Sequence, residues 1–383
     1  MYWRKVAGAL ASAPALQPKA LATAAFAGGL LVGAATGLKL TAGLFEPALC
    51  LAFVATVGPW WRGLGLGVLA GIGVLIGVAL AGGAWFWHAY DLTGNPFFPY
   101  LNNLFHSDLA VGESNRELSR LPRGLVAWLA QPVLIYLEPW LISLRFRDPR
   151  LAATYLATLV GLMLLLWQGL RRHRPPLLGP GIRFLLVFVA VAYVVWLVLF
   201  GVYRYAIVLE MLAPLLFTAV LFAFAAPSWR WPLAAGALLG LAVLTQQGDW
   251  QRRPFGRLGD AYVAVQGIDP GPLADAMVLM TAWRPGSKWR PASFLMPSFP
   301  AQVKFIRIAA SDDPAENTYP GASRIARERI ARHRGPFFVL FNPEDAETVG
   351  RQLAFFGLRQ PEGRCDTLTS NVAEPFRLCP VAR

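Results

Sequence analysis

Seven long apolar stretches dominate the first two thirds of the chain. A helix that crosses a bilayer needs about 20 mainly apolar residues, because the hydrocarbon core is about 30 Å thick. The candidate spans are residues 20–38, 42–60, 63–87, 151–170, 183–201, 205–226 and 231–246. With 56% hydrophobic and only 15% charged residues, the composition excludes a wholly water-soluble protein. The sequence therefore predicts a polytopic α-helical membrane bundle of about seven spans over residues 1–246.

Residues 247–383 have the patterns of a small soluble α/β domain. They predict two strands, a helix, a strand, a second helix and a short strand pair, hence a partly parallel sheet. The segments are AMVLMTA, VKFIRIAA, GASRIARERIARHRG, PFFVLFNP, EDAETVGRQLAFFGL and CDTLTSNVAEPFRLCPV. On the first helix, Arg324 to Arg334 are expected on the exposed face, and Ile325 and Ile330 on the buried one. The domain lacks a G-x-G-x-x-G or P-loop sequence, so no cofactor is predicted.

The net charge of +13 does not indicate a nucleic-acid partner. Residues 1–246 carry 17 Lys and Arg against 8 Asp and Glu, an excess of +9, whereas residues 247–383 carry 18 against 14, an excess of +4. Most of the positive charge therefore belongs to the membrane part, where it sets orientation.

The short connections between spans indicate that orientation. With the N-terminus inside, the inner connections hold Arg4, Lys5, Lys19, Arg62, Arg171, Arg172, Arg174, Arg183 and Arg230. Cytoplasmic loops are enriched in such residues, so the outer loop 88–150 and the tail are predicted to lie outside. Segment 124–144 leaves an alternative, because a crossing there would place the tail inside. Its Pro132, Glu138 and Pro139 favour an amphipathic helix in the membrane interface.

Two of the three cysteines, Cys365 and Cys379, flank a short segment of the tail, while Cys50 lies in an apolar span. An outside tail permits a disulfide between Cys365 and Cys379. Two unpaired thiols are the alternative.

The loop after the third span groups aromatic residues around two prolines and a Gly-Asn-Pro turn. Such a loop is expected to be ordered and to re-enter or follow the membrane interface. His88, Asp91, His106 and Asp108 lie here, but their spacing matches no ligand signature, so no metal is predicted. Asp91 is the candidate general base or sugar ligand. Alternatively, Asp91 and Asn95 only cap the turn.

Charged residues at span ends are candidates for function, because a charge in hydrocarbon is costly. Lys39 ends the first span and Glu46 begins the second, where they either pair or reach separately to the interface. Arg204 lies in a short outer connection, and Glu210 lies about a turn and a half deeper in the next span. Their separation of six residues places them on different helix faces, so the partner of Glu210 is expected to be Lys39 or a loop residue.

Three motifs in combination resemble the membrane glycosyltransferases of the GT-C superfamily, in particular bacterial members related to aminoarabinose and mannose transferases. They are W-x-W-H-A-Y-D-L-T-G-N-P-F-F-P-Y-L-N-N-L-F, G-L-K-L-T and Y-R-Y-A-I-V-L-E-M-L-A-P, and the resemblance covers roughly residues 30–245. It implies a polyprenyl-phosphate-linked sugar donor, an active site between outer loops and the bilayer, and a multi-pass protein of the bacterial inner membrane. The substrate-binding residues it implies are Lys39, His88, Asn95, Arg204 and Glu210.

The chain departs from that superfamily in one respect. GT-C enzymes keep a catalytic acidic residue in a large first outer loop, whereas the first outer connection here, near residues 40–42, is very short. The chain is therefore expected to correspond to the later half of such an enzyme, truncated or reduced, and the resemblance assigns no catalytic residue.

Two functions remain open from the sequence. The first is a membrane glycosyltransferase, or its C-terminal portion, that uses a polyprenyl-phosphate donor at the outer face of the inner membrane. The second is a non-catalytic membrane subunit or scaffold for envelope polysaccharide assembly, with membrane lipid and other envelope-assembly proteins as partners. The missing first-loop acidic motif favours the scaffold, and the polar groups near the outer boundary favour the enzyme.

Overall fold

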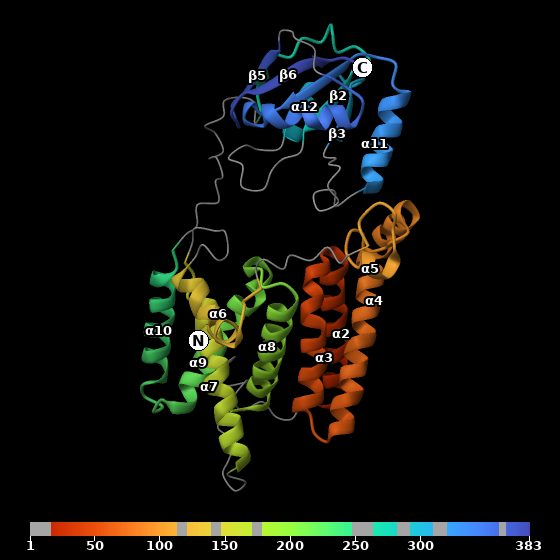
Figure 1. The fold of residues 1–383 in the computed structure, drawn as a ribbon. Coiled ribbons are helices and arrows are strands. Elements are labelled where there is room, and N and C mark those ends of the chain that lie inside the picture. Colours follow the sequence, from red (N-terminus) through yellow and green to blue (C-terminus); the bar gives the residue numbers. More distant parts are fainter. Residues whose placement is uncertain are drawn as a thin grey trace. The chain divides into compact units, whose positions relative to one another are not determined.

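The computed structural model describes residues 17–112, 121–138, 147–170, 178–246, 263–281, 292–308, 320–359 and 365–383. They form two compact units, each assembled from separate parts of the sequence. The helical unit comprises Met1–His88 and Arg116–Gln251, and the sheet unit comprises Ala89–Asn115 and Arg252–Arg383. Figure 1 shows the helices of the first unit and the sheet and helices of the second. The first part of the predicted outer loop, Ala89–Asn115, groups with the tail.

Among the described residues, five helices are long and apolar enough to cross a membrane, so the predicted count of seven is not confirmed. They are α2 (Pro18–Leu38), α4 (Trp60–Thr93), α7 (Arg150–Leu170), α8 (Pro180–Leu199) and α9 (Ile207–Phe224). Shorter helices occupy the other two predicted spans: α3 (Phe45–Thr56), which follows the 3-10 turn η1 (Leu40–Leu44), and α10 (Arg230–Leu244). One reason is local, since a residue that precedes proline disfavours helix and the Gly58-Pro59 pair stops α3 early.

Helix α4 carries exposed tryptophans near both of its ends. Its 34 residues correspond to about 51 Å, well beyond the thickness of a hydrocarbon core. Trp60 and Trp61 at one end, and Trp85 and Trp87 near the other, are all more than half exposed. The two pairs are about 37 Å apart along the helix, the spacing expected for tryptophans at the two interfaces of a bilayer.

Glycines bring α2 and α4 into close contact. Gly29, Gly33 and Gly37 recur every four residues on α2. A Cβ atom at Gly29 would overlap the carbonyl oxygen of Ala70, and one at Gly33 would overlap that of Val74. Small residues at this spacing allow two helix backbones to approach in a membrane, where dispersion contacts replace the hydrophobic effect. Gly29 contacts Ala70 and Gly33, four residues later, contacts Val74, so α2 and α4 run parallel.

Helix α3 returns the chain between these two parallel helices. Gly63 of α4 faces the carbonyl oxygen of Phe53, and Gly67 faces that of Cys50. Numbers on α3 fall as those on α4 rise, so α3 runs antiparallel to α4. A short helix thus carries the chain back toward the end at which α4 begins.

Several ends of the helical unit meet at one place, which we call the Tyr205 end. The ammonium group of Lys39, just after α2, lies 5.3 Å from the centre of the Tyr205 ring. Arg150 at the start of α7 lies 3.7 Å from Glu210 in the first turn of α9. The backbone N–H of Gln246, just after α10, donates to the carbonyl of Arg147 at 2.8 Å.

The connection between α4 and α7 therefore begins and ends at the Tyr205 end. Its helix α6 (Leu125–Leu137) has 13 residues, about 20 Å, which is shorter than the hydrocarbon core. This geometry agrees with the interface helix predicted for segment 124–144 and disagrees with a crossing. Residues 139–146 of that segment lie outside the described ranges.

The sheet unit has six strands in the order β1-β5-β6-β4-β2-β3. They are β1 (Val265–Gln266), β2 (Met277–Thr281), β3 (Lys304–Ile308), β4 (Phe337–Phe341), β5 (Asp366–Ser370) and β6 (Phe376–Val381). β2 pairs parallel with both β3 and β4, and the remaining pairs are antiparallel. The partly parallel sheet and the order of elements agree with the sequence analysis, which missed only the two-residue β1 and the 3-10 segments.

Helices α11 (Pro320–Arg332) and α12 (Ala346–Phe355) pack on one face of this sheet. Ala326 and Ile330 of α11 and Leu353 of α12 join Ile306 and Val339 of the strands in one buried cluster. Alternation along the strands sends the other side chains to a second cluster on the opposite face, next to the 3-10 segment η4 (Ala292–Ser298). Ile330 is buried as predicted, whereas Ile325 is half-buried.

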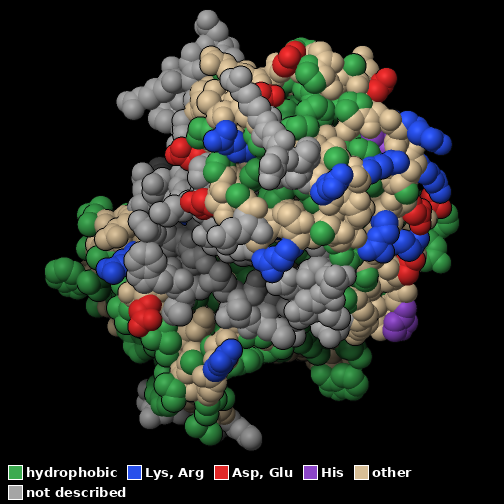
Figure 2. Space-filling view, turned by 45° about the horizontal axis from the view of Figure 1, so that its top comes forward, with side chains coloured by type: hydrophobic (Ala, Val, Ile, Leu, Met, Phe, Trp, Pro, Cys, Tyr) green, Lys and Arg blue, Asp and Glu red, His purple; other side chains and the backbone are tan. Residues whose placement is uncertain are grey.

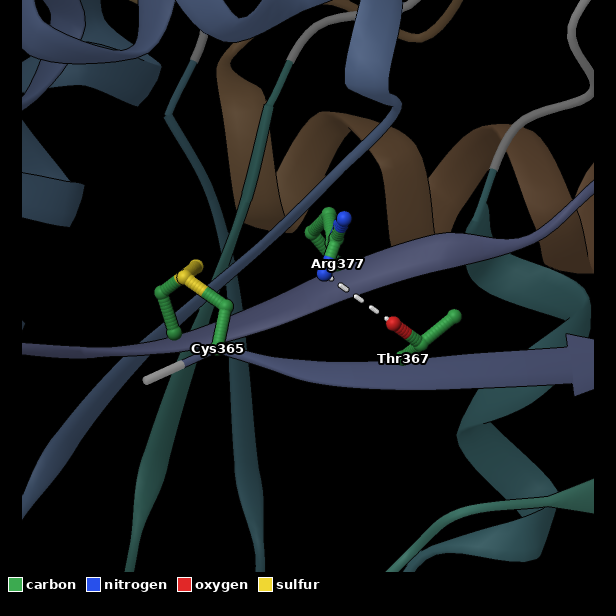
Figure 3. The surroundings of a disulfide bond; sticks show 4 residues. Cys365, Thr367 and Arg377 are labelled. Carbon is green, nitrogen blue, oxygen red and sulfur yellow. Dashed lines mark hydrogen bonds between the residues drawn. A yellow bond between two sulfur atoms is a disulfide. The ribbon is translucent and has the colours of Figure 1, made fainter. Parts of the chain in front are cut away.

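Cys365 and Cys379 form a disulfide, with their Cα atoms 4.3 Å apart (Figure 3). The bridge joins the residue before β5 to the middle of β6. Farther along the same hairpin, Arg377 donates a hydrogen bond to the hydroxyl of Thr367 at 3.1 Å. The closed segment spans 14 residues, for which the chain-entropy argument gives about 3 kcal/mol of stabilisation.

The aromatic loop that follows α4 is held together by two buried asparagines. The amide of Asn95 donates to the carbonyl of Tyr100 at 2.9 Å. The amide of Asn102, in the short helix α5 (Asn102–Phe105), donates to the carbonyls of Ser107, Ala110 and Val111. Both asparagines are fully buried. The loop is therefore ordered, as the sequence predicts.

The same loop is joined to α11. The Asp108 carboxylate pairs with the Arg324 guanidinium at 2.7 Å. At Gly321 a Cβ atom would overlap the backbone of Asp108 and Leu109, so glycine permits a close approach there. These contacts explain why residues 89–115 group with the tail.

The α2–α4 contact generates a test. Gly33→Ala should lower the stability of the helical unit, because the added methyl group would separate the two backbones. Thermal unfolding in detergent should show the change. Gly28→Ala is the matched control, since its Cβ meets only a Leu49 methyl group at 3.9 Å. That control should be neutral or slightly stabilising, since Ala favours helix by about 1 kcal/mol over Gly. Equal behaviour of both variants would contradict the close contact.

Candidate functional site

Two exposed cations flank one aromatic ring at the Tyr205 end. The Lys39 ammonium and the Arg204 guanidinium each lie 5.3 Å from the Tyr205 ring centre. Arg204 also donates to the Tyr205 hydroxyl at 3.4 Å. The structure thus brings together two of the predicted substrate-binding residues, Lys39 and Arg204, which lie far apart in the sequence. Two cations beside a ring at a membrane boundary are suited to an anion such as a phosphate.

The connection between α8 and α9 positions this pair. The indole of Trp196, which is fully buried in α8, donates to the Val202 carbonyl at 2.8 Å. Gly201 has a φ of 57°, a left-handed conformation that favours glycine. The 3-10 turn η3 (Tyr203–Tyr205) follows directly. It points Tyr203 into the protein and leaves Arg204 exposed.

A buried charge network lies behind the turn. The Arg150 Nε atom donates to both carboxylate oxygens of Asp148 at 2.9 Å. A second guanidinium nitrogen of Arg150 lies 3.7 Å from the Glu210 carboxylate. The Asp148 side chain is fully buried and that of Glu210 is 5% exposed. The Tyr203 hydroxyl is buried beside Glu210. Burial, and then the Glu210 charge, raise the pKa of Tyr203 above its ordinary value, so the phenol stays protonated at neutral pH.

Glu210 has one of the two partners expected from the sequence. Its cation is Arg150, the last residue of the predicted outer loop 88–150, and not Lys39. Asp148 and Arg150 were not selected, although the Asp-Pro-Arg sequence directly before an apolar span was the available signal. Thr154, one turn into α7, donates to the Leu209 carbonyl at 3.1 Å and fixes α7 against α9 beside this network.

Lys39 and Glu46 do not pair within the part of the chain that the structure describes. Lys39 is exposed and takes Tyr205 instead. Glu46, in the first turn of α3, is half-buried, and its Oε1 atom is buried without a hydrogen bond among the described residues. This arrangement favours separate positions for the two charges over the ion-pair alternative.

The contacts of the described residues link none of the predicted site residues of the aromatic loop to Lys39 or Arg204. His88 is exposed near the end of α4, with its ring 6.1 Å from that of Trp85. Asp91 is exposed in the last turn of α4, in the sheet unit. Asn95 also accepts from the Phe97 amide at 2.9 Å, so its side chain is used within the turn, as the capping alternative expects. His106 directly follows α5 in a left-handed backbone conformation, with a φ of 53°. The described residues contain no group of three or more His, Cys, Asp or Glu that could hold a metal.

The chain matches no protein-family model, and no curated protein and no solved structure is significantly similar to it.

Arg150 provides a test of the network. Arg150→Ala should lower the free energy of unfolding by about 3 kcal/mol, because Asp148 and Glu210 would remain buried without their cation. This value is at the low end for a broken buried pair because Arg150 is 38% exposed. Unfolding in mixed micelles should measure the loss. Arg204→Ala is the control, since Arg204 is exposed and should change stability by less than about 1 kcal/mol.

Proposed function

We propose that this chain is a membrane glycosyltransferase of the GT-C type, or the C-terminal portion of one, that binds a polyprenyl-phosphate-linked sugar. The observation that carries the proposal is the convergence of Lys39 and Arg204 on Tyr205 at one end of the helical unit. The sequence resemblance to GT-C enzymes includes both cations.

The chemistry of this pair suits a lipid phosphate. The Arg204 guanidinium provides a planar set of donors for two phosphate oxygens, and the Lys39 ammonium adds a second positive charge. Lys39 directly follows the apolar helix α2, and Arg204 lies between the apolar helices α8 and α9. A polyprenyl chain would therefore lie in hydrocarbon while its phosphate contacts the two cations. The flat face of Tyr205 offers a surface for a sugar ring. In this proposal Arg150 is a positioning residue, because it acts through α9 and the turn that holds Arg204.

The proposal also extends to topology. The two short helices α3 and α10 each return the chain to the opposite end of the helical unit, which supports seven passes. An N-inside orientation then places the Tyr205 end, the loop after α4 and the tail on the outer face of the bacterial inner membrane. Asp91 remains the candidate base.

One observation favours the alternative of a non-catalytic subunit or scaffold. Among the described residues, the carboxylates of Asp148 and Glu210 behind the Lys39–Arg204 pair are buried and engaged with Arg150. A catalytic base must be accessible to the acceptor hydroxyl. Under this alternative the chain binds the lipid-linked sugar and transfers nothing, with other envelope-assembly proteins as partners.

Binding of a lipid phosphate tests the shared part of both functions. With the full chain in lipid nanodiscs, Lys39→Ala/Arg204→Ala should weaken the binding of farnesyl phosphate, a short polyprenyl phosphate, at least tenfold, since a charge-assisted hydrogen bond contributes about 1.5–3 kcal/mol. Lys19→Ala/Arg62→Ala is the matched control, because it removes two exposed cations near the starts of α2 and α4, at the opposite end. Unchanged affinity in the first pair, or an equal loss in the control, would reject the site.

Transfer of sugar separates the enzyme from the scaffold. The enzyme should move labelled sugar from the lipid donor to an acceptor, and Asp91→Asn should reduce the rate at least a hundredfold if Asp91 is the base. A chain that binds the lipid phosphate but shows no transfer with any tested acceptor favours the scaffold.

Reporter fusions test the orientation. Alkaline phosphatase should be active when fused after Arg383 and when fused after Gly112. These positions follow α10 and α4 in the chain, both helices end at the Tyr205 end, and that end is expected outside. Green fluorescent protein at the same two positions should not fluoresce. Opposite results at the two positions would mean that segment 124–144 crosses the membrane.

A further inference from the structure

Helix α11 presents an arginine face that the proposed sugar-lipid site does not use. Figure 2 shows a run of Lys and Arg side chains along the upper right of the view. From residue 320 to residue 334 there are five arginines and one glutamate, Glu328, a net charge of +4. The five arginines are all exposed: Arg324, Arg327, Arg329, Arg332 and Arg334. We call these residues the α11 arginine face.

Parts of the sheet unit hold this face in place. The Arg327 guanidinium lies 4.6 Å from the Phe355 ring centre on α12. Arg383 donates to the carbonyls of Ile330 and His333 and so caps the C-terminal end of α11. No ion pair involves Arg329 or Arg332 within the described residues. Their charges are therefore available to a partner.

The same unit also carries an apolar loop tip, on the loop whose Asp108 pairs with Arg324 at the start of α11. Tyr100 and Leu101 are each 43% exposed and Leu104 is 67% exposed. The loop that carries them joins the start of α11 through the Asp108–Arg324 pair. Leu101 has a φ of 55°, a left-handed conformation that costs a branched side chain energy. The Asn102 amide and its three carbonyl partners keep the backbone in this shape. A rigid loop thus displays apolar side chains to solvent.

We propose that the α11 arginine face and the loop tip of Tyr100, Leu101 and Leu104 form a peripheral surface that docks the sheet unit on anionic phospholipid headgroups. Basic residues next to exposed aromatic and leucine side chains are the usual combination for binding at an anionic membrane surface. The loop follows α4 directly, and α4 carries the exposed Trp85 and Trp87 of one membrane interface. The membrane helices keep a bilayer close to the sheet unit, which raises the effective concentration of headgroups. This inference does not depend on the sugar-lipid site.

The test uses the full chain in nanodiscs of phosphatidylcholine alone or with 30% phosphatidylglycerol. An environment-sensitive nitrobenzoxadiazole label is attached at Asn103→Cys, an exposed position in the short helix α5, in a Cys50→Ala background that leaves one free thiol. The label emission should shift to the blue in the anionic discs, and 0.5 M NaCl should reverse the shift. Identical emission in both kinds of disc would overturn the proposal.

Substitutions identify the surface. Arg329→Ala/Arg332→Ala should reduce the docking equilibrium constant about thirtyfold, the effect expected for two arginines near an anionic surface. Alanine maintains the helix. The matched control Arg307→Ala/Arg377→Ala removes two exposed arginines from the strands, and Arg307 points to the sheet face opposite α11. The control should retain the shift.

Two further results would overturn the proposal. One is an equal loss in the control pair, which would indicate only a general effect of net charge. The other is a response of the label to soluble dextran sulfate without a response to phosphatidylglycerol, which would assign the arginine face to an anionic polymer. Leu104→Asn should weaken docking with the arginines intact, and an unchanged shift in that variant would remove the loop tip from the surface.

Discussion

The ion pair of Arg150 with Asp148 and Glu210 is the interaction on which the helical unit depends at the Tyr205 end. Asp148 and Glu210 are almost fully buried, and a carboxylate in that setting must have a cation close to it. Arg150 is the first residue of α7, and Glu210 lies in the first turn of α9. The pair therefore fixes how far α7 is shifted along its axis relative to α9. The Trp196 indole holds the turn between α8 and α9 through the Val202 carbonyl, and Tyr203 of this turn is buried beside Glu210. Arg204 consequently contacts the Tyr205 ring, which Lys39 at the end of α2 also contacts.

The network and the cation pair have separate roles in this arrangement. Arg150 is committed to two carboxylates, so its charge is largely balanced within the protein. Lys39 and Arg204 share an aromatic ring, which is a weak interaction compared with a phosphate. The buried charges therefore supply rigidity, whereas the exposed cations remain free to exchange Tyr205 for a ligand.

The sequence predicted the sheet unit better than the helical unit. Strand and helix periods differ, so the order of elements from Met277 to Val381 could be derived from the side-chain pattern alone. In the membrane part every segment is apolar, and composition does not reveal where a helix stops, so two of seven predicted spans are short. The close approach of α2 to α4 depends on Gly29 and Gly33, which composition counts as neutral. Lys39 and Arg204 were selected because charge is rare near a span, but the partner of Glu210 required the fold, since Arg150 lies 60 residues away.

The contact of Asp108 with Arg324 has a consequence for biosynthesis. The two residues are 216 positions apart, and α6 to α10 lie between them in the sequence. During translation the loop that carries Asp108 emerges well before α11 exists, so it must wait on its side of the membrane while the intervening helices insert. Contacts of such long sequence separation form late, because much chain must be ordered first.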